Sequence, residues 1–337
     1  MTIAIKPTVL IIGCGPANFD PNPPPCTISF DKQGHAVALT ELERQGKPVP
    51  SPTPMYAGVT ANTPRYQQRF AEKYTDYIRL NRVVTRVRHA PQDHPAVKRW
   101  LVEWTPSYTS NSPEIGKTFE EQFDHVVVAN GTDSRPFIPH IDGLWNWKGE
   151  ILHSRWYRKP EAFVGKTVMI VGGGPSKLET GWPKHINNVS PMKIVQGPSE
   201  HSNTGRIVTV LDQVIDDVDT IADQPGVHNL DSHQLFYLPD PTLAFLLLHA
   251  EAIPWPFSEM QARVVASYWI GTPLELIPHS DEDNDSHSVL VLGHPGEFEY
   301  AEGLLKLIGE GGSEEVDSEG RWGAWPEWKK HIRALID

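Results

Sequence analysis

The sequence predicts an α/β fold built from two Rossmann-type units, each of which begins with a buried strand that runs into a glycine turn. In the first unit, the β-branched and apolar run Thr8–Ile12 stops at Gly13. In the second, Lys166–Val171 runs into Gly172. A short apolar run that ends on glycines is typical of a buried strand followed by a tight turn. Two such units in one chain favour a sheet with covering helices over an all-helical or all-strand fold.

The two glycine turns have the chemistry of dinucleotide binding. The first glycine of such a turn allows the bend, the second lets the backbone approach a pyrophosphate, and the following helix N-terminus holds the phosphate. Each turn here has the first two glycines and lacks the third, so either one alone is matched equally well by an ordinary loop. Together they favour nucleotide binding, with contacts expected from Gly13, Gly15, Pro16 and Ala17 in the first turn and Gly172, Gly174 and Ser176 in the second.

An acidic residue that follows the second strand of such a unit hydrogen-bonds the ribose of the nucleotide. The expected second strand is Ala36–Thr40, and it is followed by Glu41 and Glu43. Spacing from Gly34 favours Glu41, whereas the arginine that follows favours Glu43. We prefer Glu41; the alternative for either residue is a solvated surface charge.

Other segments also have strand or helix patterns. Strands are expected at Arg82–Val87, Trp100–Trp104 and Phe123–Ala129, near Ile194 and at Ile207–Leu211, and helices at Gln67–Leu80 and Gln261–Ile270.

Composition excludes several classes of function. With 30 basic and 42 acidic residues the formal net charge is −12, which disfavours nucleic acid as a partner. Cys14 and Cys26 are the only cysteines, so neither a disulfide framework nor a cysteine-based metal site is expected, and no His-Glu-x-x-His motif is present. Apolar runs such as Leu243–Leu248 are too short to span a bilayer. Since the N-terminus lacks a signal-peptide pattern, we expect a cytoplasmic location.

The stretch Trp147-Lys-Gly149-Glu-Ile-Leu-His153-Ser-Arg-Trp-Tyr157-Arg158 resembles the F-x-G-x-x-x-H-x-x-x-Y-[KR] signature of flavin-containing monooxygenases. Trp147 replaces the phenylalanine and the other signature positions match. The stretch also precedes the second glycine turn, as it does in that family. Further segments resemble the family in the correct order: Thr60–Arg65, Ala129–Pro136, Asp240–Phe245, Ile253–Phe257 and Glu259–Ala262.

The resemblance implies which nucleotide each unit binds. An FAD-binding domain is expected from residues 1–140 and 207–337, and an NADPH-binding domain with its linker, residues 141–206, is expected as an insertion into it. The insert proper is expected to run from about Gly165 to about Gly205, with hinges at Asn130–Gly143 and near Ile207. Both domains are partly degenerate.

The resemblance also implies an activity. NADPH reduces the bound FAD, which then activates O₂ and oxygenates a sulfur or nitrogen atom of a small molecule. By analogy alone, this is a step in natural-product tailoring or xenobiotic oxidation. Asn62 is the candidate catalytic residue, because its amide is able to donate a hydrogen bond at the flavin; the alternative is a turn residue in Asn-Thr-Pro. His153 and Tyr157 are expected to organise the domain junction rather than to catalyse.

The chain departs from the family after Gly15, where four prolines lie within residues 21–25 and cannot continue the phosphate-binding helix. Pro183 shortens the helix after the second turn in the same way. Two explanations stay open: a divergent member with altered or lost cofactor affinity, or an imperfectly joined coding sequence in which Asp20–Lys32 is not native. Two other functions also remain, a Baeyer–Villiger-type monooxygenase and a non-catalytic scaffold.

Overall fold

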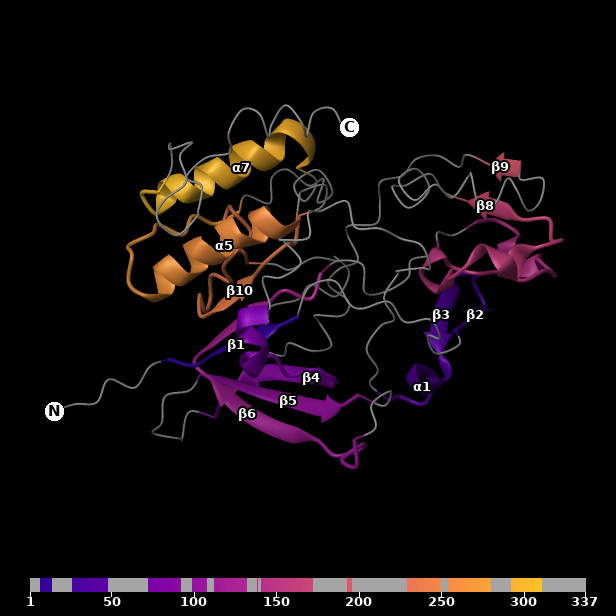
Figure 1. Cartoon of the computed structure of the whole chain (residues 1–337), viewed down its shortest axis with the longest axis horizontal. Helices are drawn as coiled ribbons and strands as arrows, with labels where there is room; N and C mark the ends of the chain where they lie inside the picture. The colour runs from indigo at the N-terminus through magenta and orange to yellow at the C-terminus, as the bar shows by residue number, and fades with distance from the viewer. Residues whose placement is uncertain are drawn as a thin grey trace. The chain divides into compact units, whose positions relative to one another are not determined.

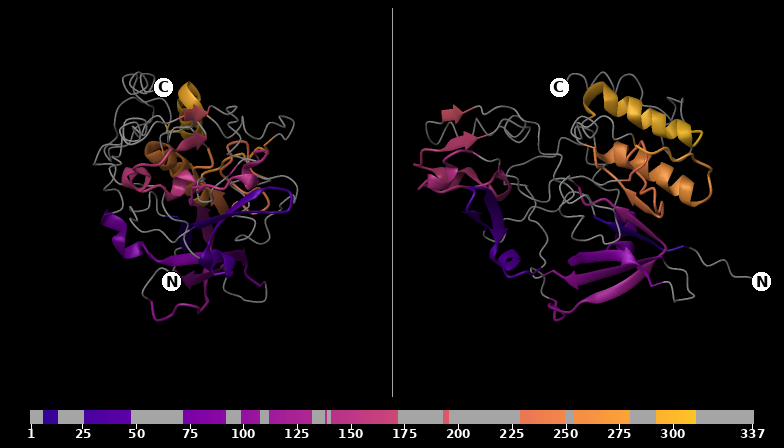
Figure 2. Two further views of the ribbon diagram at one scale, coloured as in Figure 1. Left: turned by 90° about the vertical axis from the view of Figure 1, so that its right-hand side faces the viewer. Right: turned by 180° about the vertical axis from the view of Figure 1, so that it is seen from behind.

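The computed structural model describes residues 7–13, 26–47, 72–91, 99–107, 112–131, 138, 141–171, 193–195, 229–249, 254–279 and 292–310. The chain divides into two compact units (Figure 1 and Figure 2). Unit 1 consists of Met1–Gly15, Asp76–Asp133 and Thr204–Asp337, and unit 2 of Pro16–Thr75 and Ser134–Asn203. The assignment of the two nucleotide domains to residue ranges stays a prediction.

Unit 1 contains a parallel sheet in the order β1-β7-β10, formed by β1 (Val9–Ile12), β7 (His125–Val128) and β10 (Leu243–Phe245). Ile12 of β1 and Phe245 of β10 both pair with Val128 of β7. The three strands therefore end at the same level, and their carboxyl ends form one continuous edge. The predicted strand that leads to Gly13 is confirmed as β1, but its predicted burial is wrong, because Val9 and Ile11 are exposed.

A second sheet of unit 1 is an antiparallel meander of β4 (Arg82–His89), β5 (Trp100–Pro106) and β6 (Phe119–Phe123). The strands predicted at Arg82–Val87 and Trp100–Trp104 are confirmed and run slightly further. The strand predicted at Phe123–Ala129 is confirmed as β7, which begins at His125, whereas Phe123 is the last residue of β6 and Asp124 separates the two strands. The Asp124 carboxylate accepts hydrogen bonds from the backbone N–H (2.6 Å) and the hydroxyl (2.7 Å) of Thr8, and this anchor turns the chain from one sheet into the other.

Two helices of unit 1, α5 (Pro254–Trp269) and α7 (Gly293–Leu307), pack side by side (Figure 1 and Figure 2). The helix predicted at Gln261–Ile270 is confirmed as part of α5, which starts earlier because proline is tolerated in the first turn of a helix. Helix α7 was not predicted, since Gly296 and Gly303 lower its intrinsic propensity and burial of residues such as Leu304 stabilises it instead. None of the described helices is long and apolar enough to cross a membrane.

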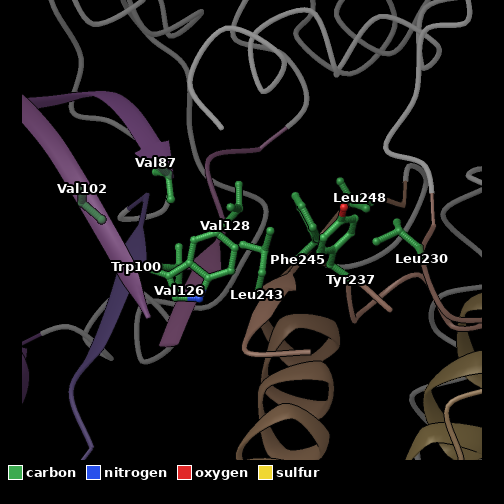
Figure 3. Close-up of a cluster of buried hydrophobic side chains, with 10 residues drawn as sticks. All are labelled: Val87, Trp100, Val102, Val126, Val128, Leu230, Tyr237, Leu243, Phe245 and Leu248. Carbon is green, nitrogen blue, oxygen red and sulfur yellow. The ribbon is translucent and has the colours of Figure 1, made fainter. Parts of the chain in front are cut away.

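The main core of unit 1 fills the space between its two sheets, as Figure 3 shows. Trp100 of β5 is fully buried, and its indole N–H donates to the hydroxyl of Thr242 at 2.9 Å. Alternate residues of the parallel strands, such as Val126 and Leu243, point into this core. Ala244 packs instead with the helices α5 and α7, so β10 is buried on both faces. Burial on both faces explains why a run as apolar as Leu243–Phe245 is a strand.

Unit 2 begins with a hairpin of β2 (Cys26–Phe30) and β3 (Ala36–Thr40), followed by the short helix α1 (Glu41–Arg44). The predicted strand Ala36–Thr40 is confirmed, whereas β2 was not predicted. The Asp31 carboxylate closes the turn by accepting the backbone N–H of Gln33 (2.9 Å) and of His35 (2.8 Å). A carboxylate that bonds backbone amides within the same turn is a common hairpin device.

The rest of unit 2 holds the second glycine unit and the stretch before it. Strand β8 (Met169–Val171) pairs in parallel with β9 (Lys193–Val195), as expected for the start of a Rossmann-type unit. Three 3-10 helices precede β8: η3 (Leu144–Asn146), η4 (Ser154–Trp156) and η5 (Pro160–Phe163). The helix predicted at Gln67–Leu80 is described only from Glu72, where the 3-10 helix η2 (Glu72–Tyr77) spans the boundary between the units. The segment Ile207–Leu211 lies outside the described residues.

Candidate functional site

Gly13 occupies the carboxyl end of β1, at the edge where all three parallel strands end. Its φ angle is +114°, a conformation that residues with side chains rarely adopt. A Cβ atom at this position would overlap the backbone carbonyl of Ala129, which follows β7. The two strand ends are joined by a hydrogen bond from the Ala129 N–H to the Ile12 carbonyl at 2.7 Å. In open α/β sheets, ligands bind outside the carboxyl ends of the strands, so this edge is the candidate site.

Most of the predicted contacts lie outside the described residues: Gly15, Pro16, Ala17, Asn62, Gly172, Gly174 and Ser176. Their roles stay predictions. Gly13 and Glu41 are the predicted site residues that the structure describes.

Glu41 and Glu43 have different surroundings at the start of α1. Glu43 is engaged locally, because its carboxylate accepts both the backbone N–H and the hydroxyl of Thr40 at 2.7 Å. Glu41 is exposed, and its carboxylate accepts the side-chain amide of Gln45 at 2.9 Å. Of the two, Glu41 has the more accessible carboxylate. Strand β3 pairs with β2, and no described pairing joins it to β1, so the ribose contact of Glu41 stays a prediction.

The signature stretch of unit 2 is held by local contacts. Gly149 lacks a side chain where the Trp147 indole lies, since a Cβ atom there would come within 2.6 Å of the indole nitrogen. The His153 ring nitrogen Nδ1 accepts the backbone N–H of Arg155 at 3.2 Å and so caps η4. Tyr157 is buried with its ring stacked on Phe163. These contacts of the signature residues are structural.

The loop that follows β10 continues the candidate edge. The Leu246 N–H donates to the Val128 carbonyl at 2.8 Å, which keeps the loop beside the end of β7. The next residue, Leu247, has a φ angle of +58°, although a leucine disfavours this left-handed conformation. The Leu247 N–H donates to the side-chain carbonyl of Gln261 at 2.9 Å. Sequence reasoning did not find this contact, because it joins a loop to a helix through a side chain with no motif of its own.

His249 ends the same loop in an apolar pocket between the two helices. Its imidazole faces Phe257 of α5 (5.7 Å between ring centroids) and Tyr300 of α7 (4.6 Å), and the residue is 7% exposed. Burial lowers the pKa of His249 to about 4, although the nearby Asp231 carboxylate opposes this shift. The Nδ1 atom has no hydrogen-bond partner among the described residues. His249 is therefore neutral at physiological pH and holds a buried polar atom that is free to accept or donate.

A buried carboxylate fixes the opposite, amino end of β10. Asp240 accepts the hydroxyl of Thr242 at 2.6 Å, both oxygens lie 3.2 Å from the Arg99 guanidinium, and His89 Nε2 lies at 3.1 Å. Burial acts to raise the pKa of Asp240, but the hydrogen bonds from Thr242 and the charge of Arg99 lower it below its ordinary value. This network ties the meander sheet to β10 and lies away from the candidate edge.

One segment contains the residue types of a hydrolase triad but does not have the geometry of a triad. In Asp231-Ser232-His233, the Ser232 hydroxyl (3.3 Å) and the Asp231 carboxylate (3.5 Å) both approach the same ring nitrogen, Nδ1 of His233. A catalytic triad needs the two groups on opposite nitrogens of the imidazole. Asp231 instead accepts the backbone N–H groups of Leu235 and Phe236 at 2.7 and 2.8 Å, which makes it a turn residue. The described residues contain no cluster that could hold a metal ion.

Comparison with known proteins gives a consistent set of relatives. Residues 47–181 match the FMO-like family, flavin-binding monooxygenase-like. The chain is 29% identical to a flavin-containing monooxygenase of Aspergillus flavus, over 72% of this chain and 63% of that protein. It is 24% identical to the trimethylamine monooxygenase of a Roseovarius species, over 93% of this chain and 84% of that protein.

A solved structure shows the same fold. The S-allyl-L-cysteine S-oxygenase from Allium sativum superposes with a TM-score of 0.56 at 19% identity, covering 85% of this chain and 75% of that one. The chain spans less than two thirds of the length of the Aspergillus flavus relative. The mixed α/β fold, the family match and these relatives agree with the signature at Trp147–Arg158. The chain is therefore similar to flavin-containing monooxygenases, with the family match over residues 47–181.

Proposed function

We propose that this protein is a monooxygenase that uses FAD and NADPH to transfer one atom of O₂ to a nitrogen or sulfur atom of a small molecule. The observation that carries the proposal is the parallel sheet β1-β7-β10 with Gly13 at its carboxyl edge, in a chain whose residues 47–181 match the flavin-binding monooxygenase-like family. The overall reaction balances as substrate, O₂, NADPH and a proton giving oxygenated substrate, NADP⁺ and water.

The described residues of unit 1 fit a nucleotide cofactor at this edge. Gly13 leaves the end of β1 free of a side chain, so a phosphate group is able to approach the backbone. On this proposal Gly15, Pro16 and Ala17 complete the pyrophosphate contact, and Glu41 binds the ribose.

FAD, when bound, supplies the electron transfer and oxygen activation that no protein side chain provides. This chain's residues would bind and orient the cofactor and keep water out of its surroundings. Leu248 and Phe245 are buried in the core behind this edge, which closes it to water from the side of the core (Figure 3). Asn62 is proposed to donate an amide hydrogen bond at the flavin, and Gly172, Gly174 and Ser176 to hold NADPH.

Nitrogen is the preferred acceptor atom in this proposal, with sulfur as the second choice. The trimethylamine monooxygenase relative, which this chain matches over most of its length, is named for an amine. Amine nitrogen and sulfide sulfur each carry a lone pair that accepts an oxygen atom without loss of a proton. A ketone has no such lone pair on its reacting carbon, so oxygen insertion beside a ketone requires a different reaction.

Flavin binding and product analysis test the proposal. We expect the purified chain to bind FAD with the absorbance of a flavoprotein, to oxidise NADPH faster when trimethylamine or dimethyl sulfide is added, and to release the N-oxide or the sulfoxide. Gly13→Ala is expected to weaken FAD binding, whereas Gly303→Ala on α7, where a Cβ atom meets nothing within 4 Å, is expected to leave it unchanged. A chain that stays colourless after reconstitution with FAD contradicts the proposal and supports a scaffold. Lactone formation from a cyclic ketone supports a Baeyer–Villiger enzyme instead.

A further inference from the structure

The loop after β10 lies at the same edge as Gly13. Ile12 and Phe245 both pair with Val128, and Leu246 bonds to the Val128 carbonyl, so the residues that follow these strands are neighbours along the carboxyl edge. Because β7 lies between β1 and β10, a group bound across the ends of all three strands would lie beside both the Gly13 turn and this loop. The conformation of Leu247 and its neighbours therefore helps to shape the site.

A leucine does not adopt the left-handed conformation of Leu247 without support. The support comes from Gln261, a residue of α5 that is 1% exposed and whose side-chain carbonyl accepts the Leu247 N–H at 2.9 Å. The side chain of Leu247 packs against the apolar cluster between α5 and α7, which holds the residue from the other side. The backbone N–H of Leu247 thus depends on one buried side-chain amide for its hydrogen bond.

The side-chain nitrogen of Gln261 is held in place as well. Its side-chain N–H donates to the Tyr300 hydroxyl at 3.3 Å, and that hydroxyl donates to the backbone carbonyl of His233 at 2.5 Å. Burial raises the pKa of Tyr300, so its hydroxyl stays protonated and keeps this orientation. The Tyr300 ring also stacks on Phe257 at 5.1 Å between centroids. A chain of hydrogen bonds therefore runs from α7 through α5 to the loop.

We propose that Gln261 is a positioning residue for the flavin site: it clasps Leu247 in the left-handed conformation and thereby fixes the loop that borders the cofactor. This inference rests on the proposed function, because it assumes that FAD binds at the carboxyl edge. Gln261 acts through Leu247 and does not itself contact the cofactor. Replacing Gln261 is expected to weaken FAD binding more than another substitution that lowers the stability of the fold by the same amount.

The first test compares the wild type with the variant Gln261→Leu. Each apoprotein is titrated with FAD, and fluorescence gives the dissociation constant of the complex. We expect about a tenfold weaker FAD complex, because the variant leaves the Leu247 N–H without an acceptor and frees the loop. Replacing Leu247 by glycine tests the route of the effect, since glycine adopts positive φ without strain. In a Leu247→Gly background, the further change Gln261→Leu is expected to weaken FAD binding by less than about threefold.

Two further variants separate positioning from stability. Tyr300→Phe keeps the ring contacts but removes the hydroxyl that orients Gln261, and it is expected to weaken FAD binding about threefold. Thr242→Val removes buried hydrogen bonds at the opposite end of β10. It is expected to lower the unfolding temperature about as much as Gln261→Leu does while leaving FAD affinity unchanged.

Each outcome decides something different. Wild-type protein that binds no FAD overturns the proposed function and this inference together. Wild-type protein that binds FAD, with Gln261→Leu binding it equally well, overturns the inference alone. An equal loss of affinity in Gln261→Leu and Thr242→Val also overturns it, because the effect then follows stability. The proposal is supported if Gln261→Leu weakens FAD binding in the wild-type background and weakens it less in the Leu247→Gly background.

Discussion

His249 makes the stability of unit 1 sensitive to mild acid. The imidazole lies between Phe257 and Tyr300 with its Nδ1 atom unpaired, and burial lowers its pKa to about 4. In the unfolded chain a histidine has a pKa of about 6.5. The unfolded state therefore takes up the proton first as the pH falls. The free energy of unfolding is at its full value above about pH 6.5 and decreases as the pH falls from there toward 4.

The size of the effect follows from the two pKa values. Each pKa unit corresponds to about 1.4 kcal/mol, so the full shift represents about 3 kcal/mol. Between pH 7 and pH 5 the unfolded state gains about 2 kcal/mol relative to the folded state from His249 alone. Asp231 and His233 on the preceding turn are the charged neighbours of this imidazole, and their opposite effects are included in its lowered pKa.

The assay is urea unfolding followed by tryptophan fluorescence at pH 7, 6 and 5, with His249→Phe as the variant. Phenylalanine keeps an aromatic ring between Phe257 and Tyr300 but does not titrate, so the variant is expected to lose about 2 kcal/mol less than the wild type between pH 7 and 5. His35→Gln is the control, because the His35 side chain is 62% exposed and its removal leaves the His249 contribution in place. Equal pH dependence in wild type and His249→Phe, or an NMR titration of His249 with a pKa near 6.5, refutes the reasoning.

Three further substitutions are expected to destabilise unit 1, each measured by urea unfolding at pH 7. Gly13→Ala forces a Cβ atom onto the Ala129 carbonyl at a φ of +114° and is expected to cost about 2 kcal/mol or more; an unchanged stability means that the turn is freer than described. Asp240→Asn weakens the pairing with Arg99 and is expected to cost about 2 kcal/mol. Because the pKa of Asp240 is lowered, that cost is present above about pH 4 and disappears as the pH falls further; a cost that persists in acid contradicts this account. Leu243→Ala empties a fully buried position and is expected to cost about 3 kcal/mol, whereas a cost under about 1 kcal/mol shows that the core closes over the cavity.

Much of the secondary structure was predictable because it depends on local patterns. The strand at Ala36–Thr40 is a short apolar run, that at Arg82–Val87 is rich in β-branched residues, and the helix around Gln261–Ile270 is rich in apolar residues. The failures arose where a distant contact decides the local structure. The strand predicted at Phe123–Ala129 begins two residues later, at His125, and the bond between Thr8 and Asp124 shows why.

The candidate site was predictable in part for the same reason. Gly13 was identified from the strand before it, because a glycine after a buried strand is a local signal. Gln261 and His249 carry no such signal. The importance of Gln261 comes from the backbone conformation of Leu247, and that of His249 comes from two aromatic rings on different helices.

The sequence by itself determined the resemblance to flavin-containing monooxygenases, because the signature at Trp147–Arg158 and the two strand–glycine turns are properties of residue identity and spacing. It also determined that Gly13 follows a strand. Only the tertiary structure decided that β1, β7 and β10 end at one level and that the loop after β10 is clasped by Gln261. These features depend on contacts between segments far apart along the chain, and such contacts form only when the core between the sheets closes.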